Sequence, residues 1–159
     1  MAALSANESA NKVWQRVQKG LTDASPAIQN SFRQLKAYLA QQRANPDLQV
    51  AFFSRADSVI AATGTVVGTG TPKVYAVYAK KGTVATASWL KVCDDATGAV
   101  TGNVRLSMHS ATAGEELAFV NPNPVAYSAG IAVQATTTAV GTTSSTGATT
   151  GFGGFVVFA

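Results

Sequence analysis

Three segments in the middle of the chain alternate apolar and polar residues with the period of two that a half-buried β-strand has. The segments are 73–79, 88–93 and 103–108, and they are rich in β-branched and aromatic residues. We expect three antiparallel strands in a meander or Greek-key sheet. The residues expected to face the core are Leu90, Val92, Val104, Leu106 and Met108, and those expected to face away are Lys91, Arg105, Ser107 and His109.

Further short β-like segments lie on both sides of this centre, at 50–54, 58–62, 65–67, 116–120, 127–135 and 152–159. Ile131, Val133 and Ala135 are expected to face inward. Loops or turns are expected at 68–72, at the proline-rich 121–124 and in the low-complexity run 136–151. About eight strands at this spacing predict an antiparallel β-sandwich or jelly roll.

The last segment is apolar on both faces, since Phe155, Val156, Val157 and Phe158 follow one another. A strand with this pattern is buried on both sides. We therefore expect it to lie centrally in a sheet or to pair with a neighbouring subunit.

The first 46 residues have a helical pattern instead. Ser5 and Glu8 form a capping box, which predicts a helix that ends near Gly20 in a left-handed conformation. Ser25-Pro26 predicts the start of a second helix, and the short connection predicts a helical hairpin. The apolar stripes are Ala10, Val13, Trp14 and Val17 in the first helix and Ile28, Phe32, Leu35 and Leu39 in the second.

Proline at position 46 disfavours helix in the residue before it and marks a boundary. Residues 1–46 are interpreted as a two-helix segment for attachment or oligomerisation, and residues 47–159 as the β-sandwich domain. The fold class is thus mainly β, with an α-helical hairpin in front.

The composition is unusual for a freely diffusing enzyme. Hydrophobic residues make up 47% of the chain and charged residues 13%, against about 25% charged in an average soluble domain. The sequence up to Arg55 contains seven basic and three acidic residues, and the rest contains five of each. The net charge of +4 therefore lies in the first third. This suits contact with an acidic surface or nucleic acid. It is equally typical of the solvated face of two helices.

Candidate chemistry is sparse. His109 has no second histidine to complete a zinc set, and Cys93 is expected to be a buried structural thiol. The pairs Asp94-Asp95 and Glu115-Glu116 are interpreted as solvated turn carboxylates, and Lys80-Lys81 as a solvated basic turn. We therefore predict no catalytic residue, no cofactor and no metal, and hence no enzyme. A single cysteine and the absence of a leader or a membrane span indicate folding in a cytoplasm without export.

Four pieces of the β region are similar to small β-sandwich proteins in the virions of tailed bacteriophages. They are Val74-Tyr75-Ala76-Val77, Trp89-Leu90-Lys91-Val92 followed by Asp95-Ala96-Thr97, Gly130-Ile131-Ala132-Val133 and Phe155-Val156-Val157-Phe158-Ala159, within residues 56–159. The resemblance implies a non-enzymatic structural role on a capsid or tail, of the capsid-decoration or minor structural type. The N-terminal helices depart from that pattern.

On this basis we expect a virion protein that decorates or cements the capsid as a homo-oligomer and is assembled in the host cytoplasm. Its partners would be the major capsid protein or neighbouring copies, with no membrane and no nucleic acid. The interface candidates are Trp14, Arg16, Phe32, Arg33, Leu35, Lys36, Leu39, Trp89, Phe155 and Phe158. The alternative is a tail, fibre or lectin-like module that binds a host-surface glycan through Trp89, Tyr75 or Tyr78.

Overall fold

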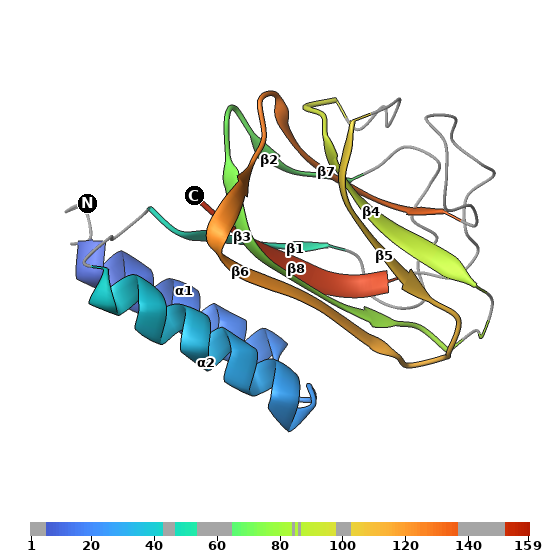
Figure 1. The fold of residues 1–159 in the computed structure, drawn as a ribbon, viewed down its shortest axis with the longest axis horizontal. Helices are drawn as coiled ribbons and strands as arrows, with labels where there is room; N and C mark the ends of the chain where they lie inside the picture. The colour runs from blue at the N-terminus through green and yellow to red at the C-terminus, as the bar shows by residue number, and fades with distance from the viewer. Residues whose placement is uncertain are drawn as a thin grey trace.

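The structure is a computed structural model that describes residues 6–42, 47–53, 65–83, 85, 87–97, 103–136 and 152–159. Within them, two helices, α1 (Ala6–Gly20) and α2 (Pro26–Gln41), precede eight strands (Figure 1). The strands are β1 (Gln49–Phe53), β2 (Thr65–Thr69), β3 (Lys73–Lys81), β4 (Ser88–Asp94), β5 (Val104–Ser110), β6 (Glu116–Ala126), β7 (Gly130–Thr136) and β8 (Phe152–Phe158). The predicted mainly β class is confirmed. Ser5, the 45–46 boundary, the expected strand at 58–62 and most of the low-complexity run lie outside the described residues.

The eight strands form two four-stranded antiparallel sheets. The first sheet has the order β1-β8-β3-β6 and the second the order β2-β7-β4-β5. The pairs β1·β8, β2·β7, β3·β6 and β4·β5 are nested, like the two arms of one long hairpin that has been rolled up. This is the strand order of a jelly roll, so the predicted sandwich is confirmed with this topology.

The expectation that all three central segments lie in one meander or Greek-key sheet is wrong. β3 lies in the first sheet between β6 and β8, whereas β4 and β5 pair with each other in the second. Alternation identifies the buried face of a strand, but it does not identify the neighbouring strand. Consecutive strands of a sandwich can pair in one sheet or cross to the other, and here the chain crosses.

Side chains from the inner faces of the two sheets form the sandwich core. The expected inward residues Leu90, Val92, Ile131, Val133 and Ala135 are all buried in it, and Leu106 and Met108 pack against it partly buried. Val104 is exposed, contrary to expectation. A register shift pairs Val92 with Leu106 but Cys93 with Val104, so the alternation breaks at the start of this edge strand.

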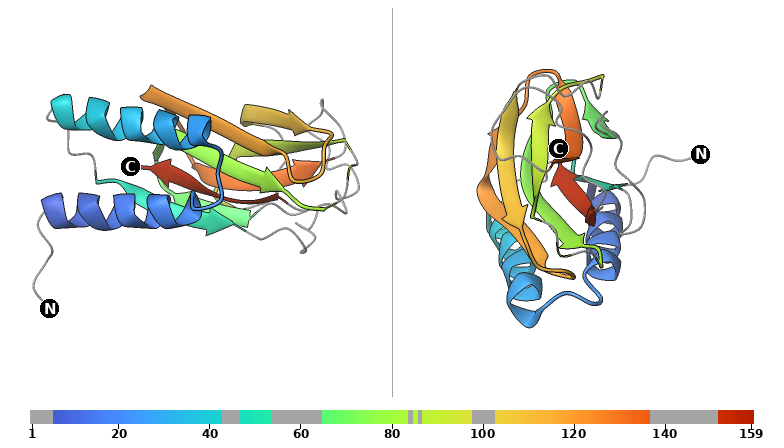
Figure 2. Two further views of the ribbon diagram at one scale, coloured as in Figure 1. Left: turned by 90° about the horizontal axis from the view of Figure 1, so that it is seen from below. Right: turned by 90° about the vertical axis from the view of Figure 1, so that its right-hand side faces the viewer.

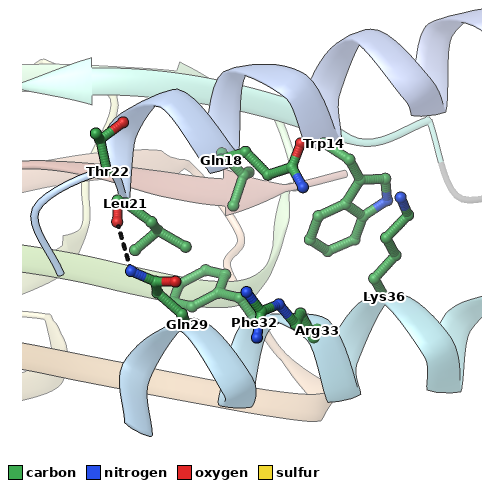
Figure 3. A pocket seen from close by; sticks show the side chains of 9 residues that line it. Trp14, Gln18, Leu21, Thr22, Gln29, Phe32, Arg33 and Lys36 are labelled. Atoms are coloured by element: carbon green, nitrogen blue, oxygen red, sulfur yellow. Dashed lines mark hydrogen bonds between the residues drawn. The ribbon is translucent and has the colours of Figure 1, made fainter. Parts of the chain in front are cut away.

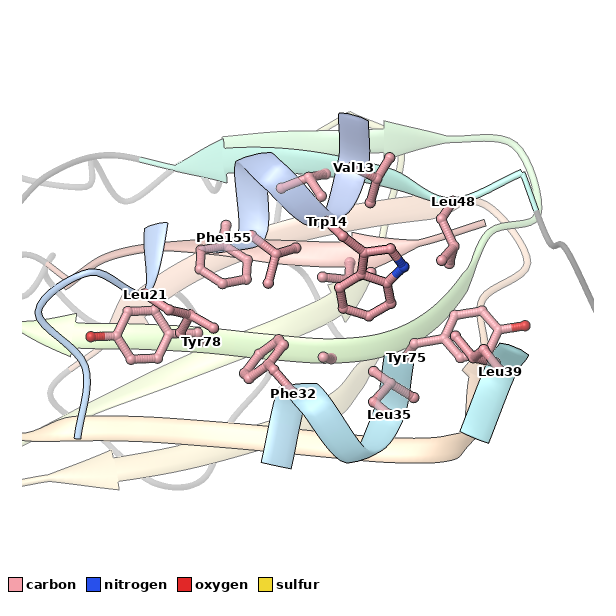
Figure 4. Packing of buried hydrophobic residues seen from close by; sticks show 14 of the residues in the cluster. Val13, Trp14, Leu21, Phe32, Leu35, Leu39, Leu48, Tyr75, Tyr78 and Phe155 are labelled. Carbon is pink, nitrogen blue, oxygen red and sulfur yellow. The ribbon is translucent and has the colours of Figure 1, made fainter. Parts of the chain in front are cut away.

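The helical hairpin covers the outer face of the first sheet, so that the molecule has three layers (Figure 2). The apolar stripes of both helices meet Tyr75 and Tyr78 of β3 and Phe155 and Val157 of β8 (Figure 4). β8 is therefore buried on both faces and lies between β1 and β3. Its expected central position is confirmed.

α1 ends at Gly20, as expected, but not through a left-handed residue. Among the described glycines only Gly70 and Gly114 have a positive φ. Gly20 is needed for space, because a β-carbon there would lie 2.7 Å from Cε1 of Phe155. The glycine thus lets the end of α1 approach the sheet.

Two expected strand boundaries in the C-terminal half of the chain are also wrong. Residues 121–124 lie inside β6, although they include two prolines. β6 is an edge strand, where a missing backbone donor is tolerated. Its pairing with β3 shifts between Val125 and Val120, and Oδ1 of Asn121 accepts a hydrogen bond from the N–H of Asn123 within this bulge (2.9 Å). Residues 127–129 precede β7, which begins at Gly130.

Candidate functional site

The apolar and the charged interface candidates of the helices lie on opposite sides of the helical layer. Trp14, Phe32, Leu35 and Leu39 are at most 7% exposed and pack against the first sheet. Arg16, Arg33 and Lys36 are exposed. Phe155 and Phe158 are buried in β8, and Trp89 is half-buried on the second sheet. Attachment through any of these residues stays a prediction, and among them the three cations are the exposed ones.

A groove of about 230 Å³ lies between α1 and α2 (Figure 3). We call it the helix groove. It exists because the helices pack on different parts of the first sheet, α1 beside β1 and α2 beside β6. Its floor is apolar and its rim is polar or basic. The floor is Trp14, Val17, Leu21 and Phe32, and the rim is Gln18, Thr22, Gln29, Arg33 and Lys36.

One end of the helix groove is closed by hydrogen bonds. Nε2 of Gln29 donates to the carbonyl oxygens of Ala24 (2.9 Å) and Leu21 (3.3 Å), and the second bond crosses between the helices (Figure 3). The indole of Trp14 and the side chain of Lys36 flank the other end. The groove therefore opens away from the turn.

The turn between the helices is fixed to the sheet by one carboxylate. Oε2 of Glu116 accepts the N–H of Ser25 (2.9 Å), and Oε1 accepts the hydroxyl of Tyr78 (3.2 Å). The Ser25 side chain makes no cap hydrogen bond, contrary to the usual role of serine before a helix. Glu116 is thus no freely solvated turn residue, and it helps to fix the spacing of α1 and α2.

The charge around the helix groove has one sign. Among the described residues Arg33 and Lys36 line it and no carboxylate does, and the sequence of α2 contains no acidic residue. Nη1 of Arg33 donates to Oδ1 of exposed Asn30 (2.9 Å), three residues earlier on α2, and this bond orients the guanidinium. The groove therefore combines an apolar floor with two cations.

A second depression, which no sequence pattern indicated, lies beside Phe52. Phe52 is 48% exposed, and the guanidinium of Arg16 lies 5.3 Å from its ring centre. The depression measures about 860 Å³ and also includes Lys19 and Lys80. Adjacent residues of a strand face opposite sides, so Phe52-Phe53 in the sequence already indicates an aromatic ring on each face of β1; the structure shows that Phe53 is the buried one.

Asp94 is a buried ion and not the solvated turn carboxylate that was expected. Its side chain is 0% exposed and is paired with Arg105, with 3.1 Å between Oδ2 and Nη2. The backbone N–H groups of Ser128 (2.9 Å) and Ala129 (2.8 Å) and the Ser128 hydroxyl (2.8 Å) also donate to it. Burial alone would raise the pKa of Asp94, but these hydrogen bonds outweigh it and lower the pKa below its ordinary value.

The basic turn is also partly internal. Lys80 is exposed as expected, but Lys81 is only 2% exposed, and its Nζ donates to the carbonyl of Ser110 (3.0 Å). The hydroxyl of Ser110 donates to Oε2 of Glu115 (2.7 Å), and this bond is the main cause that lowers the pKa of Glu115. Burial lowers the pKa of Lys81, and the charge of Glu115 partly offsets this. These groups connect β3 to the end of β5.

The remaining candidates lie on the second sheet. Cys93 is 0% exposed, and burial raises the pKa of its thiol to about 11. His109 is exposed on the outward phase, and its ring centre lies 4.6 Å from that of Trp89. Lys91 also faces outward but is only 2% exposed. In the described part of the chain, no three His, Cys, Asp or Glu side chains form a group that could hold a metal.

Comparisons with protein-family models, with curated protein sequences and with solved structures find no match. The class of protein is therefore defined by its architecture, a jelly-roll sandwich with a helical layer over one sheet. Neither described helix is long and apolar enough to cross a membrane.

Proposed function

We propose that the protein is a non-enzymatic structural protein of a phage virion, which decorates or cements the capsid through contacts between subunits. The observation that carries the proposal is a jelly-roll strand order in a chain with only 13% charged residues. Jelly rolls occur in viral capsid, lectin and cupin domains, so the fold alone does not decide between them. The scarcity of charge favours a surface that other polypeptides cover.

The use of the polar groups supports a structural role. Asp94, Lys81 and Glu116 each connect separate segments of the fold through the hydrogen bonds described above. A general acid and base must instead meet at a shared site within hydrogen-bond reach of a substrate. These three groups are engaged at different places and serve to hold the sandwich and the helices together.

In this role the protein adds buried area between shell subunits. The exposed cations Arg16, Arg33 and Lys36 and the exposed ring of Phe52 are among the groups of the helical side that offer contact. Aromatic residues and arginine are enriched in protein interfaces, whereas lysine is depleted. The partner would be the major capsid protein or a neighbouring copy, and the final location would be the virion.

The ring pair of half-buried Trp89 and exposed His109 favours a second candidate function, the recognition of a host-surface glycan by a tail, fibre or lectin-like module. Tyr75 and Tyr78 do not contribute to it, because they are 8% and 4% exposed beneath the helices. Binding on a glycan array that Trp89→Ala abolishes would favour this function over the first. An array without signal would count against it.

Electron microscopy of particles from infected cells tests the capsid role. We expect density for a jelly roll with two flanking helices on the outer surface of the head, at positions where capsid subunits meet. Particles assembled without the protein should form but break at lower temperature. Mature particles that contain no such density would refute the proposal.

A further inference from the structure

We propose that the helix groove binds an acidic peptide segment of a partner protein and that one aliphatic or aromatic side chain of this segment inserts between α1 and α2. The inference rests on the proposed function only for the identity of the partner, which would then be a capsid subunit. The binding chemistry itself follows from the groove.

The shape of the groove fits one inserted side chain. Its volume of about 230 Å³ is too small for the apolar face of a whole helix, and its floor is formed by Trp14, Val17, Leu21 and Phe32. The stems of Arg33 and Lys36 extend this apolar surface along the rim. A single large apolar side chain, surrounded by polar contacts, is the common anchor of a peptide in such a site.

The groove is held open before any partner arrives. Gln29 joins its closed end to the carbonyls of Ala24 and Leu21, and Glu116 ties the turn to the sheet through Ser25 and Tyr78. A preformed site avoids the entropic cost of ordering two helices on binding. The short segment that enters it therefore needs few contacts to bind.

The charge of the rim selects an acidic segment. Arg33 and Lys36 line the groove, and no carboxylate within the described ranges lies beside them in its lining. The amides of Gln18 and Gln29 add neutral hydrogen-bonding groups. Complementary charge of this kind speeds association and rejects basic partners.

A second copy of this chain fits the groove less well than a different protein. The chain carries a net charge of +4, and four of its eight carboxylate side chains are already engaged: Asp94 and Glu116 as described, Glu115 with Ser110, and Asp95 with the N–H of Thr97 (2.6 Å). A nucleic acid also fits less well. Single strands bind by stacking bases on exposed aromatic faces, but Trp14 and Phe32 are only 7% and 2% exposed.

The test uses the full chain with Trp89→Phe, so that Trp14 in the groove is the sole tryptophan reporter. The probe is a short peptide with one central leucine flanked by glutamates. Comparison probes replace the leucine by alanine or the glutamates by lysine, and an oligothymidylate represents nucleic acid. We expect a saturable change in Trp14 fluorescence with the first probe alone, which weakens as salt is added.

Two charge-reversed variants localise the binding. The double variant Arg33→Glu, Lys36→Glu should bind the acidic probe with an affinity at least about tenfold lower. Lys12→Glu with Lys19→Glu removes two exposed cations that do not line the groove and should change the affinity less than about twofold. Circular dichroism verifies that both variants keep the helices.

The inference is overturned if the acidic leucine probe gives no saturable signal, if both double variants lose binding equally, or if the oligothymidylate binds more tightly. These outcomes leave the capsid role untouched, because electron microscopy tests that role separately. Conversely, if the protein binds the peptide but is missing from particles, the capsid role is refuted and the groove assignment stands.

Discussion

Gly20 and Phe155 lie so close together that no side chain fits between them. A β-carbon on residue 20 would be 2.7 Å from Cε1 and 2.8 Å from Cδ1 of the Phe155 ring. The ring cannot easily move away, since Phe32, Phe52 and Tyr78 surround it with centre-to-centre distances of 5.5 to 5.6 Å. This contact fixes how closely the end of α1 approaches the first sheet.

We therefore expect Gly20→Ala to destabilise the protein by about 1–3 kcal/mol through overpacking. Helix propensity alone would predict the opposite, a gain of up to about 1 kcal/mol. Urea unfolding of Gly20→Ala, Phe155→Leu and the double variant measures the coupling. The smaller, flexible leucine should relieve part of the clash, so additive effects or a stabilised Gly20→Ala variant would contradict the packing argument.

Substitution of the buried Asp94 should lower the free energy of unfolding much more than substitution of an exposed polar residue. Asp94→Asn keeps the size of the side chain but turns an amide donor toward Ser128, Ala129 or Arg105, all of which donate. We expect a loss of about 3 kcal/mol in the free energy of unfolding. Asp23→Asn, at an exposed position in the helix turn, is the matched control and should change it by less than about 0.5 kcal/mol.

The same carboxylate predicts a pH dependence. The folded pKa of Asp94 lies below the unfolded value of about 3.9, so its stabilisation is present above that value and is lost as the pH falls through the folded pKa. The urea concentration at the unfolding midpoint of the unsubstituted chain should therefore decrease as the pH is lowered below about 4. In Asp94→Asn the midpoint should depend less on pH over this range. If the urea midpoint depends on pH equally in both proteins below about pH 4, groups other than Asp94 cause the loss of stability in acid.

Much of the fold could be predicted from the sequence, because burial imposes its period on each element. Both helices and the two-faced burial of β8 follow from apolar spacing alone. The signal for Asp94 was present too, since Leu90, Val92 and Asp94 share one phase of β4. Partner choice could not be predicted, because the sheet that receives β3 or β4 depends on contacts distant in sequence.

The candidate site was less predictable than the fold. The apolar stripes identified Trp14 and Phe32, but their spacing could not tell whether the helices would pack on each other or on the sheet. Only the second arrangement leaves a groove with Gln18 and Gln29 on its rim. Lys81 was misassigned for a related reason: its burial depends on Ser110 and Glu115, about thirty residues away.

Tyr127 has an unusual hydroxyl. Its ring is buried in the sandwich core, and within the described structure its oxygen has no hydrogen-bond partner. Burial raises the pKa of Tyr127, and nearby Cys93 and Asp94 raise it further. We expect Tyr127→Phe to be neutral or to stabilise by up to about 1 kcal/mol, because it removes an unpaired polar atom.

Tyr78→Phe is the matched control, since the Tyr78 hydroxyl donates to Glu116 (3.2 Å). It should cost about 1 kcal/mol and loosen the helix turn. Thermal unfolding of both variants makes the comparison. A larger loss for Tyr127→Phe than for Tyr78→Phe would reveal a hydrogen bond at the Tyr127 hydroxyl.

Cys93 provides a probe of how the sandwich opens. Its side chain is 0% exposed, and its pKa of about 11 leaves roughly one thiol in ten thousand ionised at neutral pH. An aromatic disulfide reagent should therefore label the native protein only through unfolding, at a rate that rises with urea. The control is Cys93→Ala with Ser107→Cys, which moves the thiol to an exposed position on neighbouring β5 and should react at once. If native Cys93 reacts as fast as that control, the second sheet opens locally at β4, and the burial of Lys91 beside it would then be lost in the same motion.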